Sequence, residues 1–405
     1  MSRLRVAVIG GGAAGIFAAL AASGDAEVTI YEKNDRVGKK ILSTGNGRCN
    51  LSNTDANMSN YHGADVEFIK YVADSFWVEE TLESFSRMGL LYKVEEGGKV
   101  FPYSNSAASV LDVLRSALER KNVSFEYGFE VRDVSKRNGV FLLTSYDGKT
   151  AEADRAVVTT GGKACPSSGS NGSGYAILQS FGHRITEIFP SLVQIKLKND
   201  VLKPLNGLKI NGTISVKSGK ETVRRETGEI LFTDYGFSGP AAFAVSRVVG
   251  EKRHCVAGID MMPEYGYSEI CEMLCRARKI MTEAEELFKG IMQKRIGQLM
   301  IKNVLGIKMN SDIKQITDSD IKRIAAKVKN FEVETDGTMS WNNAQVTAGG
   351  ALTEQFDKKT MQSKLVSGLY AAGEVLDIDG DCGGYNLQWA WASGYTAGKN
   401  AAKER

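Results

Sequence analysis

A glycine pattern near the N-terminus restricts the fold of this chain more than any other feature. Gly10, Gly12 and Gly15 are spaced G-x-G-x-x-G, after an apolar run from Arg5 to Ile9 and before an alanine-rich stretch. This order predicts a buried strand, a tight turn at Gly10 and a helix packed closely at Gly15, with room at Gly12 for a pyrophosphate. The sequence therefore predicts a Rossmann-like unit that binds a dinucleotide. A glycine-rich turn in another kind of α/β protein is the alternative.

An acidic residue follows the second predicted strand. This strand runs from Glu27 to Tyr31 and leads directly to Glu32. A carboxylate at this place binds ribose hydroxyls and disfavours a 2′-phosphate. The preceding helix offers free N–H groups and the positive end of its dipole to phosphates. We therefore expect an adenosine-containing cofactor without a 2′-phosphate.

The segment after Glu32 favours FAD over NAD. It reads DRVGKKILSTGNGRCNLSN, from Asp35 to Asn53, and is polar and interrupted by glycines. A nicotinamide-binding unit would continue with another strand and helix. This segment could instead wrap a longer cofactor and present basic groups and N–H donors to its phosphates. Taken alone, it could also be a solvated loop.

Two later strands are predicted to end in glycine. Ala156 to Thr159 leads to Thr160-Gly161-Gly162, and Leu365 to Ala372 leads to Gly373-Glu374. Ligands of open α/β sheets lie beyond the carboxyl ends of the strands, so we expect both turns to contact the cofactor.

The C-terminal stretch DCGGYNLQWAWASGYTAG, which begins at Asp381, predicts a double-glycine turn that opens a helix. The turn spans Asp379 to Gly384, and the helix starts near Asn386. The N-terminus of such a helix suits the electron-rich N1/C2=O edge of a reduced flavin. We therefore expect this stretch to close the far end of the cofactor site. A turn that serves only tight helix packing is the alternative.

Composition excludes several other classes of protein. The chain has 405 residues, 42% of them hydrophobic, which is enough for two or three domains. Its net charge of +3 gives no support for nucleic-acid or anionic-membrane binding. Six cysteines without a C-x-x-C pair, and only three histidines, argue against a disulfide framework and a metal site. Gly10 to Gly12 interrupt the N-terminal apolar run where a signal peptide would be continuous, so we expect a cytoplasmic protein without a membrane span.

Six stretches identify a family resemblance. They are VIGGGAAG, GKKILSTGNGRCN, VVTTGGKACPSSGSNGSGY, LFTDYGFSGPAAFAVS, VTAGGA and LYAAGEVLDIDGDCGGYNLQWAWASGYTAG, and they span residues 6 to 399. The chain resembles the BaiN/YhiN-like family of FAD-dependent oxidoreductases, a branch of the glutathione-reductase-like flavoprotein superfamily. It departs from the family pattern at Asp234, where histidine is usual, and at Ser173, where aspartate is usual.

The resemblance implies an α/β fold: a Rossmann-like FAD-binding domain with an inserted antiparallel β-barrel and a helical subdomain. The expected bounds are 1–190 and 341–405 for the FAD-binding domain, 191–265 for the barrel and 266–340 for the helical part. The residues agree. Ser191 to Met262 contains alternating β-branched segments, and Tyr267 to Asn330 has helical spacing, with Thr317 or Asp318 as a helix cap.

The predicted cofactor-binding residues come from all of these segments. They are Gly10, Gly12, Ala13, Ala14, Gly15, Glu32, Lys33, Lys40, Thr44, Gly45, Asn46, Arg48, Cys49, Asn50, Val131, Thr160, Gly161, Gly162, Gly373, Glu374, Gly384, Tyr385, Asn386 and Leu387. Cys49 could indicate thiol catalysis, but we interpret it as a packed thiol.

The sequence does not identify the catalytic residues. Asp234, Tyr235, Tyr385 and Arg48 are candidate proton donors. We expect an enzyme that acts on a small organic substrate bound between the FAD domain and the insertion. Both NAD(P)H-linked reduction and oxidase chemistry remain open, since the resemblance implies links to bile-acid dehydroxylation and to aminoacetone oxidation.

No second G-x-G-x-x-G follows a strand in mid-chain, so NAD(P)H would bind transiently. The alternative function is a flavin-bearing binding or RNA-associated protein. Residues 276–329, which hold 13 Lys/Arg and 6 Asp/Glu, would be its working surface, although such an excess usually marks a solvated face. The sequence leaves the oligomeric state open.

Overall fold

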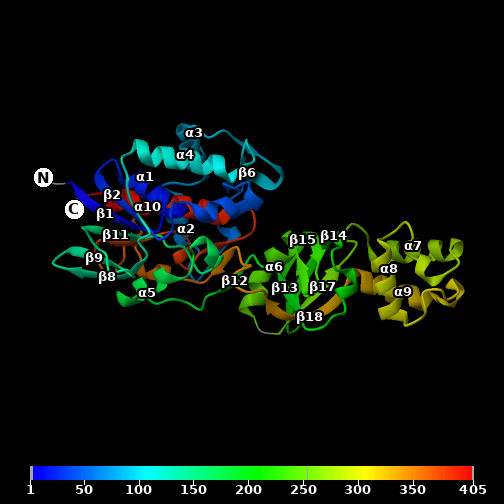
Figure 1. The fold of residues 1–405 in the computed structure, drawn as a ribbon. Coiled ribbons are helices and arrows are strands. Elements are labelled where there is room, and N and C mark those ends of the chain that lie inside the picture. The colour runs from blue at the N-terminus through cyan, green and yellow to red at the C-terminus, as the bar shows by residue number, and fades with distance from the viewer. Residues whose placement is uncertain (1–2, 253, 404–405) are drawn as a thin grey trace. The chain divides into compact units, whose positions relative to one another are not determined.

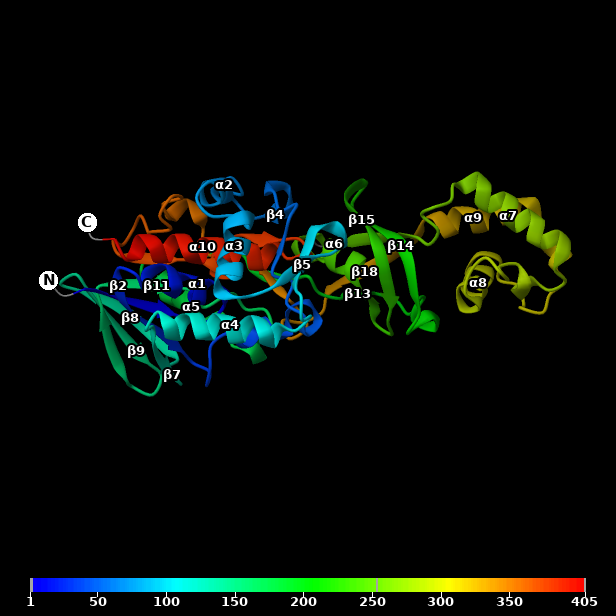
Figure 2. The same cartoon turned by 90° about the horizontal axis from the view of Figure 1, so that it is seen from above.

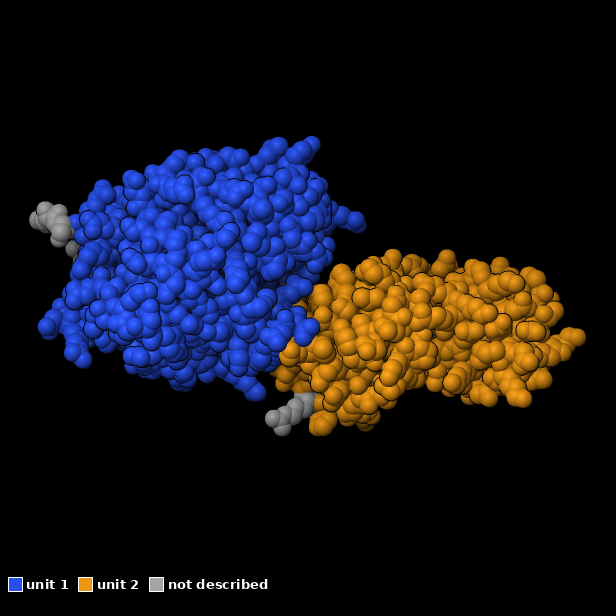
Figure 3. Space-filling model, viewed as in Figure 1, with its two compact units in different colours: residues 1–190, 341–405 blue, residues 191–340 orange. Residues whose placement is uncertain are grey.

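The computed structural model describes residues 3–252 and 254–403. The chain forms two compact units, Met1–Pro190 with Trp341–Arg405, and Ser191–Ser340 (Figure 3). Each unit has its own hydrophobic core. The first unit is therefore assembled from the two ends of the sequence, and the second is a continuous insertion.

A five-stranded parallel sheet forms the centre of the first unit (Figure 1). Its strand order is β20-β11-β1-β2-β7, and every neighbouring pair is parallel. The strands are β1 (Leu4–Ile9), β2 (Ala26–Glu32), β7 (Ser124–Tyr127), β11 (Arg155–Val158) and β20 (Leu369–Ala371). This order confirms the predicted Rossmann-like fold.

The last of these strands is shorter than predicted. The prediction began at Leu365, whereas β20 begins at Leu369 and the residues before it form a turn. The turn ends at Gly368, whose φ of +78° lies in the left-handed region and cannot continue a strand. Leu365 is 49% exposed, so an apolar residue that suggested a buried strand lies on the surface instead.

Two helices from opposite ends of the chain pack against each other on this sheet. Helix α1 (Ala13–Ala22) lies beside α10 (Tyr385–Ala401), as Figures 1 and 2 show. A Cβ atom at Gly394 would lie 2.2 Å from the Ala14 carbonyl oxygen, and one at Gly398 would lie 2.0 Å from the Ala18 carbonyl oxygen. The small residues Gly394 and Gly398 within α10 therefore serve close helix packing.

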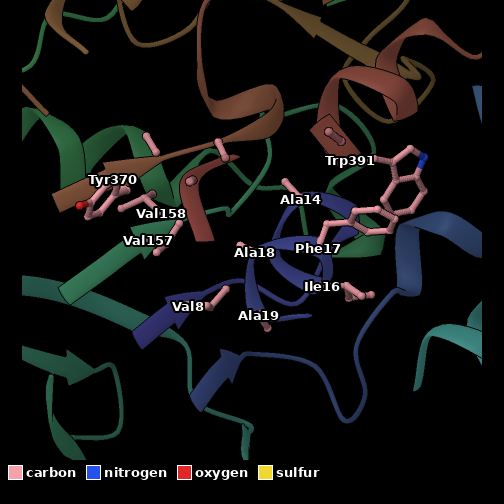
Figure 4. Packing of buried hydrophobic residues seen from close by; sticks show 14 of the residues in the cluster. Val8, Ala14, Ile16, Phe17, Ala18, Ala19, Val157, Val158, Tyr370 and Trp391 are labelled. Atoms are coloured by element: carbon pink, nitrogen blue, oxygen red, sulfur yellow. The ribbon is translucent and has the colours of Figure 1, made fainter. Parts of the chain in front are cut away.

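Aromatic and aliphatic side chains fill the space around these helices. Phe17 of α1 lies beside Trp391 of α10, with ring centroids 4.8 Å apart (Figure 4). Val8, Val157 and Val158 come from the adjacent strands and are fully or almost fully buried. The core therefore fixes the start of α1 against both the sheet and α10.

The remaining elements of the first unit surround this core. The helices are α2 (Phe68–Ala73), α3 (Val78–Met88), α4 (Ala107–Arg120) and α5 (Ser173–Ser180). The small sheets are β8 (Val131–Arg137) with β9 (Val140–Ser145) and β10 (Thr150–Ala153), β3 (Ser52–Asn53) with β6 (Lys99–Pro102) and β5 (Tyr92–Val94), β4 (Tyr61–His62) with β21 (Asp379–Gly380), and β12 (Phe189–Ser191) with β19 (Val346–Ala348).

The second unit contains the predicted antiparallel barrel. Six strands close it: β13 (Ile195–Leu197), β16 (Gly236–Ser238), β15 (Glu221–Phe232), β14 (Lys209–Ser218), β17 (Cys255–Asp260) and β18 (Phe331–Thr338). Two features differ from the sequence interpretation. Helix α6 (Pro240–Glu251) interrupts the strands, and β18 comes from beyond the range predicted for the barrel. The alternating burial along β18 is the period-2 pattern of a strand with one buried face.

The helical part of this unit contains α7 (Tyr267–Ile280), α8 (Lys294–Met300) and α9 (Asp318–Lys329). Thr317 caps α9, because its hydroxyl oxygen accepts a hydrogen bond from the Asp320 N–H at 3.2 Å. This confirms the predicted cap. Cys271 and Cys275 are free, partly buried thiols on α7. No described helix is long and apolar enough to cross a membrane.

Candidate functional site

The predicted cofactor-binding segments lie along one edge of the parallel sheet. Glu32 ends β2, Gly10 to Gly12 follow β1, Thr160 to Gly162 follow β11, and Gly373-Glu374 follow β20. These strands are direct neighbours and run in the same direction, so their carboxyl ends lie on the same side. Since neighbouring strands are about 4.8 Å apart, the four segments form a continuous row.

The three glycines of the G-x-G-x-x-G pattern have three different environments. Gly10 has a φ of +101°, and a Cβ there would lie 2.8 Å from the Thr159 carbonyl oxygen. A Cβ at Gly15 would lie 1.9 Å from the Gly10 carbonyl oxygen. At Gly12 a Cβ would meet no described atom within 4 Å. Gly10 and Gly15 are therefore required by the fold itself, whereas Gly12 leaves open space at the start of α1.

The N-terminus of α1 lacks a capping side chain. Gly12 is its N-cap residue, Ala13 and Ala14 begin the helix, and no acidic residue lies in the first turn. The first N–H groups of a helix have no partner within the helix, and they attract anions. The open space at Gly12 and the uncapped helix end fit a pyrophosphate.

The carboxylate of Glu32 is buried and organises the turn beside β1. It is 7% exposed. One oxygen accepts a hydrogen bond from the Gly11 N–H at 2.8 Å, and the other accepts hydrogen bonds from the backbone and side-chain amides of Asn34 at 2.8 and 2.6 Å. A carboxylate can accept about four hydrogen bonds, so acceptor capacity remains for ribose hydroxyls.

Two substitutions of Glu32 should therefore distinguish the contribution of its charge to FAD binding from that of its hydrogen bonds. Glu32→Ala leaves the Gly11 and Asn34 N–H groups without their acceptor, and we expect FAD binding to weaken by about 1–3 kcal/mol, roughly 5- to 150-fold. Glu32→Gln keeps one acceptor oxygen and should lose less. Titration of the apoprotein with FAD by calorimetry measures both. Glu27→Ala, at an exposed position of the same strand, is the control. Equal FAD affinity of Glu32→Ala and the control would contradict the assignment.

The adenosine end of the predicted site also contains Lys33 and Val131. The Phe129 N–H donates a hydrogen bond to the Glu32 carbonyl oxygen at 3.1 Å, which brings the start of β8 at Val131 close to the end of β2. Lys33 pairs with Glu130, with 3.5 Å between charged atoms. The structure thus brings both predicted residues to the end of β2.

The polar segment after Glu32 is a kinked 3₁₀ helix, Lys39–Gly47. Gly45 and Asn46 both have left-handed backbone conformations and are exposed. The Thr44 carbonyl oxygen accepts the Cys49 N–H at 2.9 Å, which closes the loop. Burial raises the pKa of the Cys49 thiol to about 12, so the thiol stays protonated at neutral pH. This agrees with a packed thiol and disfavours thiol catalysis.

An ion pair connects this loop to the end of β20. The Lys40 ammonium lies 2.8 Å from one carboxylate oxygen of Glu374, and the two side chains are 23% and 20% exposed. The other Glu374 oxygen accepts the Thr347 N–H at 2.8 Å. Two segments 334 residues apart in sequence are thereby fixed to each other.

Arg48 is held by contacts with other protein side chains. Its guanidinium lies over the Phe101 ring, 3.9 Å from the centroid, and pairs with Glu95 and Asn105. Hydrogen bonds from Arg48 and Lys93 lower the pKa of Glu95. These contacts hold Arg48 against the loop before α4. A direct contact between its side chain and the cofactor stays a prediction.

The turn after β11 also requires glycine. Gly161 has a φ of +71°. A Cβ at Gly162 would lie 2.3 Å from the Thr347 hydroxyl oxygen and 2.9 Å from a Glu374 oxygen. The Thr347 and Glu374 side chains therefore exclude a side chain at Gly162, and Thr160 precedes this turn at the same edge of the sheet.

The double-glycine turn meets the polar loop at the start of α10. Gly384 is the N-cap residue, with a φ of +101° and no side-chain cap. A Cβ there would lie 2.4 Å from the Ser52 carbonyl oxygen and 2.9 Å from the side-chain oxygen of Asn50. That Asn50 oxygen is buried and has no hydrogen-bond partner among the described residues. An orphaned polar atom beside an uncapped helix end is the environment expected where a polar ligand edge binds.

The first residues of α10 have mixed roles. The Asn386 side chain bonds both the N–H and the carbonyl oxygen of Gly380, at 2.8 and 2.7 Å, so it stabilises the turn. The Tyr385 carbonyl oxygen accepts the Tyr61 hydroxyl at 3.0 Å, and burial raises the pKa of the Tyr385 phenol. Leu387 is partly buried. For Asn386 only the backbone remains available to a ligand.

The residues at this edge fit FAD. The structure shows two uncapped glycine-headed helix ends, open space at Gly12, a buried acid at the end of β2 and an unpartnered amide oxygen at Asn50. Lys40, the loop Thr44 to Asn50 and the backbone at Gly384 would hold the remainder of the cofactor. Among the described residues, no group of three or more His, Cys, Asp or Glu could hold a metal ion.

Sequence reasoning missed one pair of side chains in this region. The His62 Nε2 atom lies 2.9 Å from an Asp381 carboxylate oxygen. The residues are 319 positions apart, and β4, which carries His62, has only two residues. No local pattern could have paired them. Two candidates from the sequence, Asp234 and Tyr235, lie in a hairpin turn of the second unit, where Asp234 is exposed.

Comparison with known proteins gives matches along nearly the whole chain. The model of the HI0933-like protein Rossmann domain matches residues 4–400. A 3-dehydro-bile acid delta(4,6)-reductase of Clostridium scindens is 38% identical over 408 residues, which is 98% of this chain and 99% of the relative. A ribosomal RNA dihydrouridine synthase of Escherichia coli is 29% identical over 406 residues, or 99% and 98% of the two chains.

Solved structures are more distant. The 3-ketosteroid-delta4-(5alpha)-dehydrogenase of Rhodococcus jostii has a TM-score of 0.48 and 15% identity, covering 100% of this chain and 98% of that one.

The Rossmann sheet, its cofactor edge and these relatives define the class of protein: an FAD-dependent oxidoreductase. The chain belongs to the HI0933-like family. The family resemblance predicted from the six sequence stretches is thereby confirmed.

Proposed function

We propose that this protein reduces a carbon–carbon double bond conjugated to a ketone in a small, largely apolar substrate, with NAD(P)H as the electron source. The observation that carries the proposal is the 38% identity, along 98% of the chain, to a 3-dehydro-bile acid delta(4,6)-reductase. The other family reaction considered, oxidase chemistry on an amine, has no comparable support.

Bound FAD would accept two electrons from NAD(P)H and supply them to the substrate as a hydride. The protein contributes binding and electrostatics. The uncapped end of α10 at Gly384 presents N–H donors and a positive dipole end, which stabilise negative charge on a reduced flavin. The pair Lys40–Glu374 holds the loop Thr44 to Asn50 against the sheet edge.

Anaerobic kinetics test this function. The FAD-loaded protein is mixed with NADH or NADPH, and the loss of flavin absorbance is followed. A 3-oxo-Δ4,6 bile acid or an amine such as aminoacetone is then added. We expect bleaching by one of the two nucleotides and recovery of the absorbance only with the conjugated ketone. Recovery with dioxygen alone, together with bleaching by the amine without NAD(P)H, would overturn the proposal in favour of an oxidase.

A second candidate is an RNA-associated flavoprotein, and one observation favours it. Five exposed lysines in the helical part of the second unit have no ion-pair partner within the described residues: Lys279, Lys302, Lys308, Lys314 and Lys322. The Escherichia coli relative is named as a ribosomal RNA dihydrouridine synthase. Binding of ribosomal RNA that weakens steeply with salt, and is lost when these lysines become glutamine, would support this candidate.

A further inference from the structure

A histidine and an aspartate are paired beside the start of α10. The two side chains are 23% and 17% exposed, so water reaches them only in part. His62 lies on β4, which pairs with β21, and its direct partner in the ladder is Asp379. Asp381 follows β21 directly and is two residues after Asp379. Asp379 and Asp381 therefore lie on the same side of this short ribbon as His62.

The backbone around Asp381 is held from two sides. Its N–H donates to the Asn60 carbonyl oxygen at 2.8 Å, and its carbonyl oxygen accepts the Asn386 side-chain amide at 3.4 Å. The Asn53 side chain in turn donates to the Gly383 carbonyl oxygen at 3.0 Å. The segment from Asp381 to Gly384 is thus fixed against the loop that carries Asn50. The His62–Asp381 pair belongs to the same rigid assembly as the α10 N-terminus.

The hydrogen bond to Asp381 sets the state of the His62 ring. A carboxylate accepts, so Nε2 carries a proton and donates it to Asp381. The other ring nitrogen, Nδ1, makes no hydrogen bond to a described residue. In the protonated imidazole, Nδ1 therefore holds the proton that can be transferred. After transfer, the neutral ring keeps the tautomer that Asp381 favours.

We infer that His62, oriented by Asp381, supplies the proton that accompanies hydride transfer to the substrate. The inference rests on the proposed function. Reduction of a conjugated double bond adds a hydride and a proton: two electrons arrive with the hydride from NAD(P)H by way of FAD. The proton passes from His62 Nδ1 to the carbon next to the carbonyl group. The neutral ring then regains a proton from water, and Asp381 remains ionised as a positioning residue.

The charged surroundings of His62 are acidic. Asp379 and Asp381 face it from β21 and the following turn, and a carboxylate oxygen of Asp377 accepts the Ala64 N–H at 3.2 Å. Cys382, which follows Asp381, is an exposed free thiol. Tyr385 is the other proton-bearing group beside Asp381, whose charge adds to burial in raising the pKa of that phenol. Tyr385 is therefore the competing donor that a test must separate from His62.

Variants of the FAD-loaded protein distinguish these roles. In His62→Asn we expect unchanged bleaching by NAD(P)H, but reduction of a 3-oxo-Δ4,6 bile acid slowed about 10²- to 10⁴-fold, the usual contribution of an acid catalyst. Asp381→Asn should slow the same step less than His62→Asn does, because the ring loses the carboxylate that orients it but keeps both nitrogens.

One control and one measurement without turnover complete the test. His254→Asn changes an exposed histidine of the second unit and should leave every rate unchanged. Nitrogen NMR of the protein should show the Nε2–H tautomer for neutral His62, and Asp381→Asn should weaken that preference. Wild-type rates in His62→Asn, loss of turnover in Tyr385→Phe alone, or an Nδ1–H tautomer would each overturn the inference. A wild-type protein that reduces no conjugated ketone would overturn the proposed function, and the proton role with it, whatever the NMR result.

Discussion

The Gly384→Ala variant should fold and bind FAD about 10- to 100-fold more weakly than the wild-type protein. Its Cβ would lie 2.4 Å from the Ser52 carbonyl oxygen, closer than real atoms approach, so the start of α10 or the Ser52 backbone must move. Either movement displaces the helix N-terminus from the loop carrying Asn50. Because the site binds through positioned N–H groups, a small displacement weakens several hydrogen bonds together. Fluorescence titration of the apoprotein with FAD measures the loss.

Backbone strain at a positive φ could also lower FAD affinity, so its effect must be distinguished from that of the displacement. Another glycine of the chain serves as the control. Gly89 ends α3 with a φ of +100°, almost the value of +101° at Gly384, and a Cβ there would meet no described atom within 4 Å. Gly89→Ala should therefore carry the same strain, about 1–3 kcal/mol of stability, without affecting FAD. If both variants bind FAD equally well after correction for stability, the turn serves helix packing only, and the predicted role of Gly384 fails.

The order of elements around the first strand could be predicted because local spacing determines it. Gly10 and Gly15 are each fixed by contacts within one βαβ unit or with the neighbouring strand. The same holds for the cap at Thr317, where donor and acceptor are three residues apart. Such features depend on short-range geometry, which a sequence pattern records directly.

Features that depend on distant segments could not be predicted in the same way. The ion pair Lys40–Glu374 and the pair His62–Asp381 join residues 334 and 319 positions apart. The strand β18 was missed as part of the barrel because it is separated by the helices α7 to α9 from the strands it joins. In each case the individual residue types are common, and only the fold brings them together.

The small residues of the C-terminal stretch illustrate how one pattern can serve two purposes. Gly394 and Gly398 lie within α10 and allow its backbone to contact α1. Gly384 lies at the start of the same helix, where its φ of +101° and its neighbours Asn50 and Ser52 mark the predicted cofactor edge. Glycine content alone cannot distinguish these functions. The distinction comes from what a Cβ atom would meet: helix backbone in the first case, and the polar loop in the second.

Gly12→Val should give a stably folded protein that does not retain FAD, the largest effect we expect from a single substitution. The φ of Gly12 is −78°, and a Cβ would meet no described atom within 4 Å, so the apoprotein has room for the side chain. The methyl groups would occupy the space over the uncapped start of α1 where the pyrophosphate must approach. The variant should therefore show wild-type circular dichroism and thermal unfolding as apoprotein, and release no flavin after purification.

Gly24→Val is the matched control for this variant, because Gly24 also has open space for a Cβ and lies just beyond the other end of α1. It should retain FAD fully. Gly15→Ala gives the opposite pattern: its Cβ would lie 1.9 Å from the Gly10 carbonyl oxygen, so the fold itself should be destabilised. A Gly12→Val protein that keeps wild-type FAD affinity would place the cofactor elsewhere, because the added side chain lies at the start of α1.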